Sequence, residues 1–196
     1  MFSFVFRLKR KLRITVFNLL YKRDFRAFGS HSYIYRPIRL TPGFISIGNK
    51  VQVNDFARIE GLDRYNDKSF QPKIILHDHV SIQQGLHLTC AKSIEIGSHT
   101  AIAANVSITD INHPYADVSI APEYQDIEVD EVIIGEDCKI YNNAVILPGV
   151  RLGRHTVVAA NAVVMKGDYG DYVILGGAPA KVLKRYDFEK RQWTKV

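Results

Sequence analysis

Apolar residues recur at intervals of six along the second half of the chain, and a small or compact residue follows four places after most of them. Neither an α-helix, with a period of 3.6 residues, nor a β-strand, with a period of two, produces this spacing. A six-residue period is typical of a parallel β-helix, in which each repeat forms one short strand and one turn, and three repeats close a triangular coil. The apolar series is Ile134, Ile140, Ile146, Leu152, Val158 and Val164, and the compact series is Cys138, Ala144, Val150, Thr156 and Ala162.

The repeat also predicts which side chains stack on one another. Apolar residues that are one coil apart should lie in a column, so Ile134 is expected against Leu152. Two polar stretches, 61–73 and 112–131, break the spacing and are expected to be inserted loops. Outside these loops the same spacing extends upstream through Ile47, Val53, Ile59, Leu76, Ile82, Leu88, Ile96, Ile102 and Ile108.

These limits define the expected organisation of the chain. We predict an all-β fold whose parallel β-helix covers residues 41–175. Residues 1–40 precede it as an amphipathic helix and a cap, because apolar residues there are spaced three to four apart. Residues 176–196 follow it as a turn and a short C-terminal helix over 182–189.

Positive charge is concentrated at the N-terminus. Residues 1–28 hold eight of the 26 lysines and arginines and a single acid, whereas the net charge of the whole chain is +6, so the remainder is close to neutral. Nucleic-acid binding is therefore not expected. The helix could adsorb reversibly to an anionic membrane surface, or it could cap the first coil, and the two roles are compatible. Apolar contact with a membrane is expected from Phe2, Phe4, Phe6 and Leu8.

Cysteine content and hydropathy favour a cytoplasmic protein. The chain has two cysteines, Cys90 and Cys138, which form no disulfide framework, and Cys138 occupies an inward position of the repeat. The N-terminus lacks the long apolar run and small-residue cleavage site of a secretory signal. Its longest apolar run, residues 14–21, is too short to span a bilayer.

Three further motifs suggest a family. Residues 108–114 read Ile-Thr-Asp-Ile-Asn-His-Pro, residues 144–150 read Ala-Val-Ile-Leu-Pro-Gly-Val, and residues 176–181 read Gly-Gly-Ala-Pro-Ala-Lys. With these motifs, residues 44–186 resemble the hexapeptide-repeat O-acetyltransferases of the galactoside and maltose type. The likeness is closer to the enzymes that acetylate sugars of lipopolysaccharide O-antigen or capsule. The resemblance implies a left-handed β-helix, a homotrimer, acetyl-CoA as donor and a sugar acceptor from a surface polysaccharide or its precursor.

The resemblance assigns the catalytic base to His113, at the start of the longer loop. A sugar hydroxyl must lose its proton as it attacks a thioester, and an imidazole with a near-neutral pKa suits that task. Asn105 matches a position that contacts the acceptor, although asparagine is also common in turns. Asp110 could bind acceptor hydroxyls or orient the histidine, but it could equally cap a turn.

The resemblance also implies a donor site between two prisms of the trimer. Asn142 and Ala160 match positions that contact the pantetheine arm of coenzyme A. Lys166 matches another donor-site position, and Lys181 and Lys184 match the basic pair near the nucleotide phosphates. Two residues depart from the family pattern, Lys139 where an aromatic is common and Tyr141 where glycine is usual, so the packing around the donor arm should differ.

Two other functions are compatible with the sequence. The acceptor could be another small molecule, such as serine, an amino sugar or a free galactoside. A non-catalytic or metal-binding β-helix, as in carbonic-anhydrase-like proteins, would need histidines that meet at a metal. Only His77, His79 and His99 are candidates, and their spacing does not fit, so no metal is expected.

Overall fold

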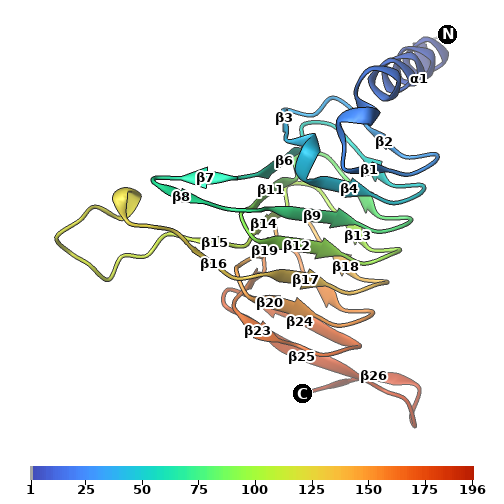
Figure 1. Ribbon diagram of the computed structural model, residues 1–196. Helices are drawn as coiled ribbons and strands as arrows, with labels where there is room; N and C mark the ends of the chain where they lie inside the picture. Colours follow the sequence, from blue (N-terminus) through green and yellow to red (C-terminus); the bar gives the residue numbers. More distant parts are fainter. Residues whose placement is uncertain (1) are drawn as a thin grey trace.

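The computed structural model describes residues 2–196, with side chains from Phe4 onward, and it forms a three-sided prism of stacked coils (Figure 1). Each coil contributes one strand to each of three parallel sheets, which we call sheets A, B and C. Sheet A comprises β1 (Ala27–Phe28), β4 (Ile45–Ile47), β9 (Lys73–Leu76), β12 (Ser93–Ile96), β17 (Val132–Ile134), β20 (Val150–Leu152) and β23 (Gly167–Asp168). Sheet B contains β2 (Tyr33–Ile34), β5 (Gln52–Val53), β10 (Ser81–Ile82), β13 (Ala101–Ile102), β18 (Lys139–Ile140), β21 (Val157–Val158) and β24 (Val173–Gly177). Sheet C contains β3 (Arg39–Leu40), β6 (Arg58–Gly61), β11 (His87–Cys90), β14 (Ser107–Thr109), β19 (Val145–Ile146) and β22 (Val163–Val164).

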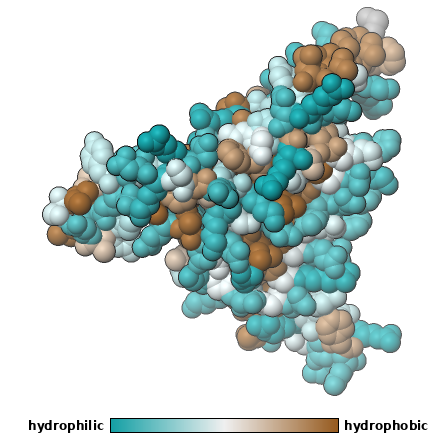
Figure 2. All heavy atoms as spheres, in the orientation of Figure 1, coloured by the Kyte–Doolittle hydropathy of each residue, from teal (hydrophilic) through white to brown (hydrophobic). Residues whose placement is uncertain are grey.

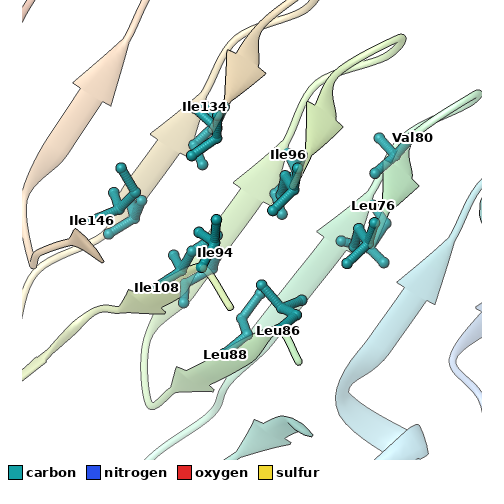
Figure 3. Close-up of a cluster of buried hydrophobic side chains, with 14 of the residues drawn as sticks. Leu76, Val80, Leu86, Leu88, Ile94, Ile96, Ile108, Ile134 and Ile146 are labelled. Atoms are coloured by element: carbon teal, nitrogen blue, oxygen red, sulfur yellow. The ribbon is translucent and has the colours of Figure 1, made fainter. Parts of the chain in front are cut away.

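The stacking predicted from the repeat is confirmed. Ile134 pairs with Leu152 in adjacent strands of sheet A, and Ile108 pairs with Ile146 in sheet C. Figure 3 shows two of these columns inside the prism, namely Leu76, Ile96 and Ile134 of sheet A and Leu88, Ile108 and Ile146 of sheet C. Burial of each such side chain contributes about 1.5–3 kcal/mol, so the repeat itself supplies the core.

The prism begins earlier than predicted. Strands β1, β2 and β3 pair in parallel with β4, β5 and β6, so residues 27–40 form a first coil. The boundary expected at residue 41 is therefore wrong. The six-residue spacing is obscured there because the short connections carry Gly29, Ser32 and Pro37 in place of regular apolar positions.

Helix α1 (Phe2–Tyr21) packs one face against the first coil and projects beyond the N-terminal end of the prism (Figure 1). The Arg10 guanidinium donates to Asn54 Oδ1 at 2.7 Å and to the Tyr33 hydroxyl at 3.0 Å. Asn18 Nδ2 donates to the Ser32 carbonyl at 2.9 Å, and Phe17 packs against the core. Short 3₁₀ turns follow at Lys22–Asp24 and Pro42–Phe44. The side chain of Phe2, expected at a membrane surface, lies outside the described residues.

Both insertions leave the prism at the same corner, where sheet C turns into sheet A, which we call the CA corner (Figure 1). The first insertion is a hairpin of β7 (Arg64–Tyr65) and β8 (Lys68–Ser69). The second is an antiparallel ribbon of β15 (Ile111–Asn112) and β16 (Glu128–Val129), which carries a 3₁₀ turn at Pro122–Tyr124. The polar stretches predicted as inserted loops are thus insertions with short strands of their own.

The other two corners continue without insertions. We call them the AB corner and the BC corner, after the sheets they join. Each turn there contains a residue with positive φ, which permits a tight change of direction. The BC corner uses Asn105, Asn143 and Asn161 in its later turns, and asparagine tolerates this conformation better than most residues.

The C-terminal helix predicted over 182–189 is absent. Strand β25 (Ala180–Asp187) turns back beside β24, and β26 (Gln192–Lys195) pairs with β25, so both extend sheet B in antiparallel fashion. The side chains of β25 alternate between more and less exposed, as in a strand with one covered face. The free edge of β24 offers unpaired backbone groups, and pairing with them outweighs the local helical preference of residues such as Leu183 and Lys184.

Candidate active site

His113 lies at the CA corner, at the start of the ribbon. Its side chain lines an open pocket of about 460 Å³. We call this hollow the upper pocket, because it lies on the N-terminal side of the ribbon. Its wall is the outer face of sheet C, from which Arg58, His87 and Thr89 project. The imidazole is exposed to solvent and meets the ring of Tyr65 edge to face, with 5.4 Å between centroids. The predicted base is therefore accessible and stands beside a space that could hold an acceptor.

The two insertions hold each other. The Tyr65 hydroxyl donates to the Glu123 carbonyl at 2.5 Å, and Asn66 Nδ2 donates to the Tyr124 carbonyl at 3.4 Å. Lys68 forms an ion pair with Asp126 at 3.0 Å. The hairpin thus braces the ribbon that carries His113, a contact that the sequence did not reveal because it joins residues far apart in the chain.

Charged side chains shape the far end of the upper pocket. Glu60 is buried and forms ion pairs with both Arg58 and Arg39, the latter at 2.5 Å. Partial burial lowers the pKa of His87, and the nearby Arg58 cation lowers it further. His87 lines the same pocket as His113, although its place in the sequence does not distinguish it from a surface histidine. Its alternation with Leu88 on a strand could have indicated the outward direction, though not the pocket.

Asp110 lies inside the prism, below the surface of the CA corner. Its side chain is fully buried, and its carboxylate accepts backbone hydrogen bonds from Ala91, Lys92 and Ser93, each at 2.8 Å. The carboxylate therefore caps a turn, which agrees with the second interpretation of this residue, and its buried oxygens do not line the upper pocket. These bonds hold the turn between β11 and β12, in the coil on the N-terminal side of the point where the ribbon leaves the prism.

A second pocket lies on the other side of the ribbon. This lower pocket of about 390 Å³ is lined by Asn112 and Glu128 of the ribbon and by Pro148, Met165 and Lys166 of the later coils. Lys166 forms an ion pair with Asp130 at 2.6 Å. The hydrogen bond from Lys166 lowers the pKa of Asp130, and the same bond raises the pKa of Lys166. The predicted donor residue Lys166 thus faces this pocket with its charge already partnered.

Three other predicted residues, Asn105, Asn142 and Ala160, lie at the BC corner, away from His113. The side-chain amides of Asn105, Asn143 and Asn161 form a ladder, in which Asn105 donates to Asn143 at 3.4 Å and Asn143 donates to Asn161 at 3.0 Å. Asn142 and Ala160 occupy equivalent, exposed places in adjacent turns, joined by the bond from the Asn161 amide to the Asn142 carbonyl. One chain therefore does not bring Asn105, Asn142 or Ala160 to the histidine.

The two predicted phosphate-binding lysines lie in β25. Lys181 pairs with Gly176 at the BC end of sheet B, and Lys184 pairs with Ile174 farther along the strand. Lys181 is exposed and Lys184 is half-buried. Within residues 2–196, no group of three or more His, Cys, Asp or Glu side chains converges as metal ligands would, and no helix is long and apolar enough to cross a membrane.

Comparison with known proteins agrees with this architecture. Residues 131–166 match the family model of bacterial transferases with hexapeptide repeats. WbbJ of Escherichia coli K12, a putative lipopolysaccharide biosynthesis O-acetyl transferase, is 34% identical over 130 residues, which are 63% of this chain and 66% of that protein. Other curated relatives are matched over 27% and 52% of their lengths, so the chain spans less than two thirds of these relatives.

Solved structures share the fold. AntD of Bacillus cereus, an N-acyltransferase crystallised with dTDP and 3-hydroxybutyryl-CoA, superposes with a TM-score of 0.73 at 21% identity, covering 88% of this chain and 89% of AntD. The acetyltransferase VCA0836 of Vibrio cholerae, crystallised with acetyl-CoA, gives a TM-score of 0.60 at 22% identity over 85% of this chain and 74% of its own. The chain thus shares its six-residue repeat with the bacterial hexapeptide transferases over residues 131–166, and it shares the fold of AntD and VCA0836.

Proposed function

We propose that this protein transfers an acetyl group from acetyl-CoA to a sugar hydroxyl of a bacterial surface polysaccharide or its precursor. The observation that carries the proposal is the position of His113, which lines the upper pocket directly after Asn112, a residue that lines the lower pocket. A transfer between two substrates needs two binding spaces that meet at one base. The likeness to WbbJ supports the choice of acceptor class.

The chemistry assigned to His113 is proton transfer. Its imidazole takes the proton of the acceptor hydroxyl as the oxygen attacks the thioester carbonyl. The tetrahedral intermediate then collapses, the C–S bond breaks, and the coenzyme A thiolate leaves with the proton that the imidazolium returns. Tyr65 packs against the imidazole and limits its orientations. The role proposed for Asp110 is structural, since its carboxylate holds the turn of residues 90–93 next to the start of the ribbon.

Assembly into a homotrimer would complete the site. The BC corner of a neighbouring copy, with Asn142 and Ala160 in its exposed turns, would face the CA corner that carries His113. The pantetheine arm would lie in that groove, Asn105 would face the acceptor, and Lys181 and Lys184 would attract the nucleotide phosphates. The separation of these residues within one chain supports this arrangement.

The same geometry could serve an amine acceptor, and AntD, an N-acyltransferase, shares the fold. A direct test incubates the purified protein with acetyl-CoA and parallel panels of neutral sugars, amino sugars and serine. Mass spectrometry should find one added acetyl group on a sugar oxygen, accompanied by stoichiometric free coenzyme A. Acetylation of amines alone would replace the proposed acceptor, and release of coenzyme A without any acceptor product would contradict transfer.

We also propose that helix α1 holds the protein at the cytoplasmic face of a membrane. Opposite the face that caps the prism, Leu8, Leu12 and Leu19 are 58%, 63% and 75% exposed. Figure 2 shows apolar side chains on this projecting helix. The helix has several basic residues and no acidic one. The positive charge of the helix would oppose its pairing with the same helix of a second copy. The same charge attracts anionic lipid, at about 1 kcal/mol for each basic group.

Liposome co-sedimentation tests this placement. The protein should bind vesicles of anionic lipid, should bind neutral vesicles much less, and should be released by salt. Replacing Leu8, Leu12 and Leu19 with serine should abolish binding and leave the cap intact, because none of the three contacts the prism face. Equal binding to both kinds of vesicle, or to neither, would refute membrane attachment.

A further inference from the structure

The C-terminal hairpin builds an aromatic hollow at the AB corner, the one corner that the proposed reaction does not use. His155 and Tyr172 come from turns of the last coils, whereas Tyr186 and Trp193 come from β25 and β26. These four side chains surround an open space of about 310 Å³. The structure brings them together only because the C-terminus forms strands in place of the helix predicted from sequence.

The four rings line the surface of the hollow and are not buried against one another as in a hydrophobic core. The His155 ring lies nearly parallel to those of Tyr172 and Trp193, with centroids 5.5 Å and 6.4 Å apart, and Tyr186 stands nearly perpendicular to Trp193 at 5.4 Å. None of the four is buried, and the adjoining Phe188 is 63% exposed. A cluster that served only to hold the hairpin would gain more by burying these rings.

The chemistry of the lining points to a ligand with both apolar and polar parts. Each ring offers a flat face, and each also carries a polar atom at its edge, namely an indole N–H, two phenol hydroxyls and the imidazole nitrogens. A sugar ring is complementary, since its C–H face can stack on an aromatic ring and its hydroxyls can bond to the polar edges. Small-molecule sites commonly have this mixture of aromatic walls and few polar groups.

On the His155 side of the hollow, charge favours a neutral ligand over a nucleotide, whereas Lys184 and Lys195 lie beyond Tyr186 and Trp193 on the paired strands. Arg154, the cation next to His155, is already held by Asp137 at 2.7 Å and by Glu136 at 3.3 Å. A phosphate would have to compete with both carboxylates for this guanidinium. We infer that the aromatic hollow binds a neutral sugar unit of a glycan, separately from the site of acetyl transfer, and this inference rests on the proposed polysaccharide substrate.

Tryptophan fluorescence tests the hollow directly, because Trp193 is the single tryptophan of the chain. The full-length protein is titrated with soluble dextran, mannan and galactan, and in a separate arm with adenosine monophosphate. At least one neutral glycan should change the emission to saturation. Its apparent Kd should rise at least about tenfold in Tyr172→Ala and stay near the wild-type value in Tyr172→Phe, which keeps the stacking ring. Tyr124→Ala, which removes an exposed tyrosine of the ribbon, controls for general loss of an aromatic side chain.

The outcomes separate this inference from the proposed function. A folded protein that binds acetyl-CoA but shows no saturable response to any of the three glycans would overturn the hollow as a sugar site. A saturable response to adenosine monophosphate with none to glycans would also overturn it, and would identify the hollow as a nucleotide-binding site. A glycan response in a protein that transfers no acetyl group would support the hollow while the proposed function fails.

Discussion

The CA and BC corners of the prism are built from the same repeat and differ in nearly every other respect. At the CA corner the chain leaves the coil twice, and the hairpin and ribbon that result contact each other and carry His113. At the BC corner the chain never leaves the coil, and Asn105, Asn143 and Asn161 stack in a regular ladder. One corner thus provides a reactive group on an insertion, and the other provides a straight, rigid edge.

The difference explains why one chain is an incomplete site. A stacked β-helix fixes every turn against the turns above and below, so the BC corner can present identical backbone geometry along a groove. Such regularity suits an extended donor such as coenzyme A. A side chain that must take a proton needs to reach out of the prism, and only an insertion allows that. This difference predicts that the complete site forms between the CA corner of one copy and the BC corner of a neighbouring copy.

Removing the reactive group should have the largest effect on activity. His113→Ala should lower kcat by about 10²–10⁴, the usual contribution of a general base, and should leave the affinity for acetyl-CoA unchanged. Steady-state kinetics and donor titration measure both. His87→Ala is the matched control, because His87 lines the same pocket but does not lie on the ribbon. Near-normal turnover in His113→Ala would show that His113 is not the general base.

The buried carboxylate of Asp110 should matter for stability. Asp110→Asn replaces one of the two oxygens that accept the backbone N–H groups of residues 91–93, so at least one buried donor loses its partner. We expect a loss of about 2–4 kcal/mol in the free energy of unfolding, measured by urea denaturation. Asp117→Asn, in the exposed loop of the ribbon, should change stability little. A stable Asp110→Asn protein with a raised KM for the acceptor would restore the acceptor-contact role.

The brace between the insertions should have a smaller effect. Tyr65→Ala removes both the ring against His113 and the bond to the Glu123 carbonyl, and kcat should fall about tenfold with little change in either KM. Tyr65→Phe keeps the ring and should recover most of this loss. If the two variants have equal activity, the ring does not position the histidine.

The sequence predicts the regular parts of this comparison and misses the contacts between the irregular ones. The period of six was enough to place Ile134 against Leu152 and to locate both insertions, because a repeat fixes its own register. It could not show that Tyr65 meets Glu123, which depends on the path of two loops in space. It also left Asp110 ambiguous, since a carboxylate that caps a turn and one that binds a sugar have the same local sequence. The C-terminal strands were missed because the edge of β24, and not the local sequence, determines their form.

Mixed trimers test most directly whether the two corners work across copies. His113→Ala disables the CA corner, and Ala160→Trp should block the donor groove at the BC corner, so each homotrimer should be inactive. Equal co-expression of the two variants should restore about a quarter of the wild-type activity, the fraction of interfaces that combine an intact corner of each kind. A chain carrying both substitutions, mixed with His113→Ala, should restore none. Verified mixed trimers of the two single variants that remain as inactive as their parents would contradict a site shared between copies.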